Sequence, residues 1–107
     1  MFCSRGRSSS YLDWPVAPEA PIGLSATRSI DGVNLEWRRY GNETLVGFEI
    51  QRSLDWGTWQ KVAEVKFDQM RYSEKLPSGA HTSYRVRAIG KQAPSAWSNP
   101  AWIDQSN

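Results

Sequence analysis

The chain has 107 residues, 39% of them hydrophobic, 12% aromatic and 22% charged, which is enough for one small globular domain. Its single cysteine and single histidine exclude an internal disulfide and predict no metal centre, and its short apolar runs predict no membrane-spanning segment. Thirteen basic and eleven acidic residues give a net charge of +2, and two of the basic ones lie in the first ten residues, so the remainder is formally neutral. Nucleic-acid binding typically needs a concentrated basic face. We therefore expect no cofactor, no nucleic-acid partner and no membrane partner.

Residues 1–16 are predicted to form an extended N-terminal arm ahead of a folded domain at residues 17–107. The first ten residues are rich in Gly, Ser and Arg and hold little that a core could bury. Large apolar side chains follow, and such groups in an arm indicate docking on the chain's own domain or on a neighbour. The candidate partner-binding residues of the arm are Arg5, Arg7, Tyr11, Leu12 and Trp14. No apolar stretch typical of a secretory signal is present, so we expect synthesis in the cytoplasm without a signal peptide.

From residue 22 onward the hydrophobic period is two, which is the period of a β-strand. Val33, Leu35 and Trp37, for example, alternate with polar residues and follow an Asp-Gly turn. No window of eleven or more residues sustains a helical stripe. The alternation and the turn residues predict strands at 22–26, 33–37, 46–50, 59–65, 70–73, 84–88 and 97–103. Seven short strands with frequent turns indicate an all-β protein, a seven-stranded antiparallel immunoglobulin-like β-sandwich.

Five segments carry a closer resemblance. They read APEAPIGLSA (17–26), VNLEW (33–37), VGFEIQRS (46–53), WQKVA (59–63) and TSYRVRA (82–88), and in this order and spacing they resemble a fibronectin type III domain over residues 17–104. The resemblance implies that Trp37 is the centre of the core. It also implies a scaffold used for interaction, because members of this family serve many unrelated functions.

One detail departs from the family pattern. The tyrosine that often ties the corner before the sixth strand would fall at Thr82, with Tyr84 two residues later. Either Tyr84 supplies this corner in a shifted register, or the corner lacks its usual bond from hydroxyl to backbone. The segment from Ser95 to Ser98 resembles half of the cytokine-receptor WSxWS signature, and we interpret it as the start of the last strand.

The sequence predicts no catalytic residue, and we expect that the protein is not an enzyme. His81 is the one imidazole, and we place it in a turn at residues 78–83 without the buried acid and the oxyanion donors that a serine triad needs. Glu36 and Glu49 are expected on outward strand faces, as solvated charges that discourage edge pairing.

Six tryptophans exceed what one small sandwich core can enclose. Trp56 occupies a glycine-like position in a turn, where its ring either projects into solvent or folds back on the stem of Lys61 or Arg52. Exposed tryptophans are typical of interface hot spots and of sugar-stacking platforms. Trp56 and Trp59 are therefore the candidate binding residues of the exposed loops, although core or half-buried packing is favoured for Trp59. The other four are assigned as follows: Trp37 to the core, Trp97 to core or half-buried packing, and Trp14 and Trp102 to end-capping or, less favoured, neighbour contacts.

These observations leave two hypotheses. The first is a non-catalytic structural or interaction module, a virion accessory protein of a phage head or tail that docks through its arm on a capsid or tail protein or on copies of itself. It rests on a stand-alone domain of this family that begins with methionine, lacks a signal peptide and carries the arm. The alternative is a carbohydrate or cell-surface binding module that stacks a glycan on Trp56 and Trp59.

Overall fold

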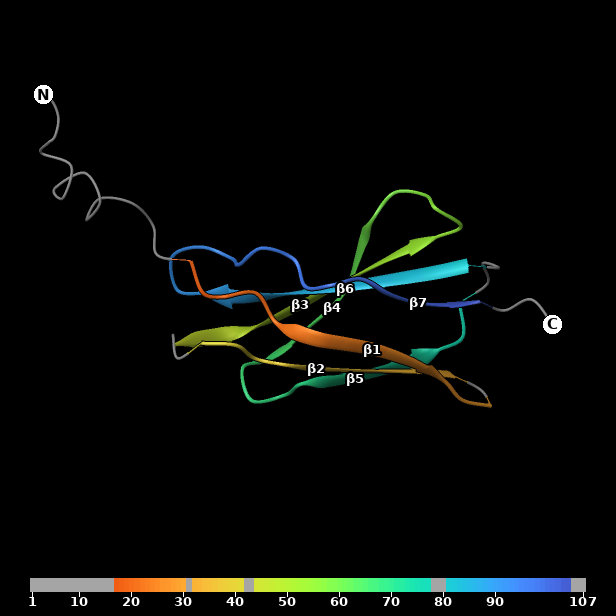
Figure 1. Ribbon diagram of the computed structural model, residues 1–107, viewed down its shortest axis with the longest axis horizontal. Helices are drawn as coiled ribbons and strands as arrows, with labels where there is room; N and C mark the ends of the chain where they lie inside the picture. The colour runs from red at the N-terminus through yellow and green to blue at the C-terminus, as the bar shows by residue number, and fades with distance from the viewer. Residues whose placement is uncertain (1–16, 31, 42–43, 78–80, 105–107) are drawn as a thin grey trace, which may run out of the picture.

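The computed structural model describes residues 17–30, 32–41, 44–77 and 81–104, which form two antiparallel sheets packed face to face (Figure 1). One sheet has the order β1 (Ile22–Arg28), β2 (Gly32–Arg38), β5 (Arg71–Lys75). The four-stranded sheet has the order β4 (Gln60–Lys66), β3 (Leu45–Leu54), β6 (His81–Gly90), β7 (Ala101–Asp104). Within these ranges the predicted all-β sandwich of seven strands is confirmed. No helix among the described residues is long and apolar enough to cross a membrane.

The core lies between the two sheets and follows the predicted alternation. β2 buries Val33, Leu35 and Trp37 and exposes the residues between them. The Trp37 ring meets Phe48 edge to face, with the ring centroids 5.6 Å apart and the planes at 66°. Full burial of side chains of this size contributes about 1.5–3 kcal/mol each. The remaining core side chains are Leu24, Leu45, Ile50, Tyr84, Val86, Ala88, Ala101 and Ile103.

A polar cluster also joins the sheets across one end of the interior. The Tyr84 hydroxyl of β6 donates a hydrogen bond of 2.6 Å to the Glu74 carboxylate of β5, which Arg52 also contacts at 2.8 Å. Burial and then this hydrogen bond raise the pKa of Tyr84 well above its ordinary value. A tyrosine hydroxyl can donate one hydrogen bond, and here it donates to Glu74. The structure therefore favours the second alternative for the corner, in which the usual hydrogen bond from the tyrosine hydroxyl to the backbone is absent. The Tyr84 hydroxyl bonds to the Glu74 carboxylate instead.

The last strand is shorter than predicted, because Ser95 and Ser98 replace regular pairing with side-chain hydrogen bonds. The backbone N–H of Ala88 donates to Ser95 Oγ at 2.8 Å, and that of Val86 donates to Ser98 Oγ at 3.1 Å. Each serine N–H returns a bond of 2.8 Å to the carbonyl of the same β6 residue. This segment therefore follows β6 as a loop, and β7 begins only at Ala101.

Candidate functional site

A groove of about 740 Å³ lies on the outer face of the four-stranded sheet, at the end where β6 begins. Its floor is formed by Ser53 and Ser83, which pair across β3 and β6. Trp102 of β7 pairs with Ser83 on the far side, and Trp59 lines the groove just before β4. Because adjacent strands lie about 4.8 Å apart, two small residues between two tryptophans leave a trough in the sheet surface.

The turn from β3 to β4 brings Trp56 to the rim of this groove. Asp55 and Trp56 both adopt left-handed backbone conformations, with φ values of 51° and 67°. The Gly57 N–H donates to the Leu54 carbonyl at 2.8 Å, which closes a tight hairpin turn. Turns of this kind favour Asn-Gly, and a bulky residue at such a φ is strained by about 1 kcal/mol or more.

Hydrogen bonds to β6 and within the turn hold this strained conformation. Asp55 accepts from the His81 N–H at 2.8 Å through its carboxylate, and its own N–H donates to the His81 carbonyl at 2.7 Å. The Ser53 hydroxyl donates to the Gly57 carbonyl at 2.7 Å. The position of Trp56 is therefore fixed by three contacts that its own side chain does not make.

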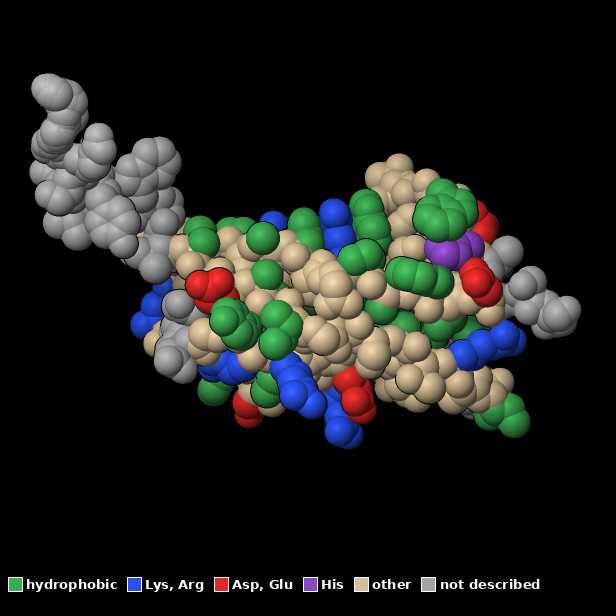
Figure 2. All heavy atoms as spheres, viewed as in Figure 1, with side chains coloured by type: hydrophobic (Ala, Val, Ile, Leu, Met, Phe, Trp, Pro, Cys, Tyr) green, Lys and Arg blue, Asp and Glu red, His purple; other side chains and the backbone are tan. Residues whose placement is uncertain are grey.

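The Trp56 ring stacks on the imidazole of His81, with ring centroids 3.9 Å apart and planes at 13°. The side chain is nevertheless 78% exposed, so one face of the indole meets His81 and the other meets solvent. The predicted projection of the Trp56 ring into solvent is confirmed. The alternative, in which the ring packs on the stem of Lys61 or Arg52, is wrong, because the ring stacks on His81. In Figure 2 the histidine, in purple, lies among hydrophobic and acidic side chains at this end of the molecule.

His81 joins Ser83 and Asp104 in a hydrogen-bonded relay. Its Nδ1 lies 2.7 Å from Asp104 Oδ1, and its Nε2 lies 3.1 Å from Ser83 Oγ. A carboxylate only accepts, so Nδ1 carries the hydrogen, and in the neutral ring Nε2 accepts from the Ser83 hydroxyl. The sequence placed His81 in a turn at residues 78–83, and this was wrong: His81 begins β6 and pairs with Asp104 of β7.

The relay connects a serine, a histidine and an aspartate as a serine triad does, but it lacks the oxyanion donors and the buried acid of a triad. Ser83 lies inside a central strand and pairs with Ser53 on one side and Trp102 on the other, so its backbone belongs to the sheet ladders and offers no oxyanion donors. Asp104 is 60% exposed, whereas a triad acid is buried. The described residues contain no group of three or more His, Cys, Asp or Glu able to hold a metal ion.

A second aromatic cluster, the arginine–tryptophan ladder, adjoins the groove and consists of Trp59, Arg85, Trp97 and Arg87. The Arg85 guanidinium carbon lies 4.4 Å from the Trp59 ring centroid and 4.0 Å from that of Trp97, which Arg87 contacts at 4.6 Å. Cation–π contacts of this kind contribute about 0.5–2 kcal/mol each. Half-buried packing of Trp59 and Trp97 is thus confirmed.

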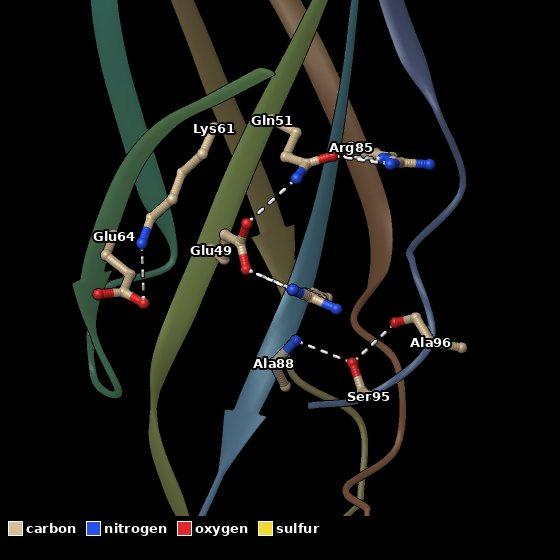
Figure 3. A network of polar contacts seen from close by, with 9 residues as sticks. Glu49, Gln51, Lys61, Glu64, Arg85, Ala88, Ser95 and Ala96 are labelled. Atoms are coloured by element: carbon tan, nitrogen blue, oxygen red, sulfur yellow. Dashed lines mark hydrogen bonds and ion pairs between the residues drawn. The ribbon is translucent and has the colours of Figure 1, made fainter. Parts of the chain in front are cut away.

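Polar residues of β3 hold the two arginines of the ladder (Figure 3). Gln51 Oε1 accepts two hydrogen bonds from Arg85, at 3.0 and 2.7 Å. Burial and the neighbouring Arg87 lower the pKa of Arg85, and Glu49 opposes this effect. Glu49 itself is buried and pairs with Arg87 at 2.8 Å, so its expected place as a solvated outward charge was wrong.

The structure thus brings both predicted loop residues, Trp56 and Trp59, to one groove and adds residues that the sequence analysis missed. Trp102 is 57% exposed and lines the groove, so the favoured end-capping role was wrong. Its outward direction could have been inferred from the buried neighbours Ala101 and Ile103. The predicted arm residues lie outside the described residues, and docking through them stays a prediction: Arg5, Arg7, Tyr11, Leu12 and Trp14.

Neither a protein-family model nor a curated protein matches the sequence. Similar solved structures include titin domains, with a TM-score of 0.73 and 22% identity over 87% of this chain and 34% of that chain. An Fn3-like protein from Clostridium thermocellum has a TM-score of 0.67 and 22% identity over 86% of this chain and 97% of its own. A β-1,2-glucanase from Parabacteroides distasonis has a TM-score of 0.71 and 24% identity over 85% of this chain and 13% of its own.

These similarities, together with the sheet order, define an immunoglobulin-like β-sandwich. More narrowly, the chain has a fibronectin type III-like fold, as the sequence predicted. Many unrelated functions occur on this architecture, so the function of a particular domain depends on the site it carries.

Proposed function

We propose that this protein is a non-catalytic binding module that holds a carbohydrate in the groove. The observation that carries the proposal is the convergence of Trp56 and Trp59 from the β3–β4 connection and Trp102 from β7 around a floor of serine hydroxyls. A pyranose ring has an apolar C–H face that packs on an indole, and its edge carries hydroxyls that need polar partners. The groove combines both kinds of surface.

The size and the exposure of the groove support this proposal. Its volume of about 740 Å³ falls within the 300–1,000 Å³ typical of small-molecule sites. Trp56 keeps one ring face open at the expense of a strained backbone, and such strain is concentrated at functional sites. A tryptophan needed only for stability would be buried or covered on both faces, as Trp37 is in the core.

The proposal is tested by titrating the protein with neutral hexasaccharides of glucose, xylose and mannose and with a decameric polyproline peptide, while tryptophan fluorescence is recorded. We expect at least one sugar to bind, and Trp56→Ala or Trp102→Ala to weaken it at least tenfold. Phe67→Ala is the matched control, because Phe67 is also an exposed aromatic residue but lies outside the groove. Binding of polyproline alone, or equal loss in the control, would contradict the proposal.

A further inference from the structure

With His81 neutral, the described residues that line the groove carry a single formal negative charge. We propose that the groove selects uncharged oligosaccharides, with Oδ2 of Asp104, which bonds to no described residue, accepting a hydrogen bond from a sugar hydroxyl. This inference rests on the proposed carbohydrate function. It names the ligand class, neutral rather than acidic sugars, and the residue that discriminates between them.

The charge distribution around the groove is the first argument. Among the lining residues that the structure describes, Asp104 is the acid and none is Lys or Arg. Arg85 is nearby but lies in the ladder, where its guanidinium contacts two indole rings and Gln51. Arg28 reaches the edge of the groove and donates to the backbone carbonyl of Asp104 at 3.3 Å. When His81 is neutral, a uronic acid or a sulfated sugar would therefore bring a like charge toward Asp104 without a Lys or Arg in the described lining to offset it.

The hydrogen-bonding capacity of the floor is the second argument. The Ser53 hydroxyl gives its hydrogen to the Gly57 carbonyl, and the Ser83 hydroxyl gives its hydrogen to Nε2 of a neutral His81. Asp104 uses Oδ1 for His81, which leaves Oδ2 and the serine lone pairs as acceptors within the described part of the chain. Sugar hydroxyls can donate to these acceptors, whereas an ionised carboxylate or sulfate only accepts. The floor therefore complements a hydroxyl and not an anion.

His81 acts here as a positioning residue. Its Nδ1 orients the Asp104 carboxylate at 2.7 Å, and its ring supports Trp56 from below at 3.9 Å. One imidazole thereby fixes both the stacking platform and the acceptor. The relay places these two features at the same end of the groove, where one sugar unit can meet both of them.

A quaternary ammonium group is the competing ligand for tryptophans beside a carboxylate. Such a group is small and is held by aromatic rings that enclose it. This groove is an open trough of about 740 Å³ with a hydroxyl floor, which leaves most of its surface unused by a trimethylammonium group. The observations favour an extended, hydroxyl-rich ligand.

The test compares neutral hexasaccharides, hexagalacturonate and tetramethylammonium on the full chain by calorimetry, with the wild type and Asp104→Asn. Asparagine keeps a carbonyl oxygen for His81 Nδ1, removes the charge and replaces the acceptor Oδ2 with an NH2 donor, so it should weaken binding of the neutral sugar and relieve the repulsion of an anion. We expect the wild type to bind a neutral sugar at least tenfold more tightly than hexagalacturonate, and Asp104→Asn to reduce this ratio to threefold or less. Asp68→Asn is the matched control, because it removes an exposed acid outside the groove and should leave the ratio unchanged.

The outcomes separate this inference from the function on which it rests. Hexagalacturonate binding as tightly as the neutral sugars, or a ratio that Asp104→Asn does not change, would overturn the inference while carbohydrate binding stands. Tetramethylammonium binding more tightly than any sugar would overturn it in favour of a cationic ligand. No binding of any sugar would overturn the proposed function together with the inference.

Discussion

Two aromatic clusters share the outer face of the four-stranded sheet, and they differ in what covers their rings. In the arginine–tryptophan ladder, Trp97 is covered by Arg85 and Arg87. In the groove, Trp56 and Trp102 keep large exposed surfaces. The difference follows the outward positions of β6, which carry arginine at 87 and 85 and the smaller residues Ser83 and His81 toward its start. Trp97, which two guanidinium groups of β6 contact, is therefore part of the structure, whereas Trp56 and Trp102 are available to a ligand. Trp59 lines the groove and is contacted by Arg85 alone, so it belongs to both clusters.

The largest effect is expected from Arg85→Ala, which removes the residue that links the two clusters. The loss of two cation–π contacts and two hydrogen bonds to Gln51 should destabilise the protein by about 2–3 kcal/mol. Urea unfolding measures this change. Arg85→Lys keeps the charge but not the planar stack, so it should restore less than half of the loss. A destabilisation below about 0.5 kcal/mol for Arg85→Ala would show that the ladder is not structural.

Trp97→Ala should destabilise the protein by about 1–2 kcal/mol, because both arginines lose a ring that they pack on. Sugar affinity should stay within threefold of the wild type, since Trp97 does not line the groove. Unfolding and binding are measured on the same sample. A tenfold loss of affinity at unchanged stability would reverse the roles that we assign to the two clusters.

Trp102→Ala should show the opposite pattern to Trp97→Ala, with unchanged stability and weaker sugar binding. Its side chain is mostly exposed, so the free energy of unfolding should change by no more than about 0.5 kcal/mol. Sugar affinity should fall about tenfold, which corresponds to about 1.4 kcal/mol. Calorimetric titration checks the second value. Unchanged affinity would remove Trp102 from the site.

Trp56→Gly should have the smallest effect on stability, because two opposing contributions nearly cancel. The variant compares the backbone strain at residue 56 with the energy of the stack on His81. Glycine relieves a left-handed strain of about 1 kcal/mol, and the lost stack on His81 costs about 0.5–1 kcal/mol. Stability should stay within about 0.5 kcal/mol of the wild type or rise slightly, while sugar affinity falls. A clear loss of stability would mean that Trp56 is held for structural reasons.

Much of the fold could be predicted from the sequence, because β2 and β6 alternate cleanly between apolar and polar residues. The late start of β7 could not be predicted. In the sequence, Ser95 and Ser98 look like the polar residues of an ordinary strand, and only the structure shows that their hydroxyls accept hydrogen bonds from the backbone of β6. Glu49 was misjudged for a related reason. Its outward direction was correct, but an outward position on a central strand can still be buried by an arginine from the next strand.

The site was predictable only in part. Trp56 stood out because it occupies a position where a turn favours glycine, and this local signal pointed to one rim of the groove. The pairing of His81 with Asp104 depends on the register between β6 and β7, which brings together residues 23 positions apart. No local pattern in the sequence specifies that register. The open face of Trp102 likewise depends on the two serines beside it on neighbouring strands.

The central claim is that the groove, and not the ladder, binds a neutral sugar. The most direct measurement is a two-dimensional NMR titration that follows the indole N–H signals of the tryptophans while a neutral hexasaccharide is added. We expect the signals of Trp56, Trp59 and Trp102 to shift together in a saturable way, while those of Trp37 and Trp97 stay in place. Saturable shifts centred on Trp97, or no shift at any groove tryptophan, would contradict it.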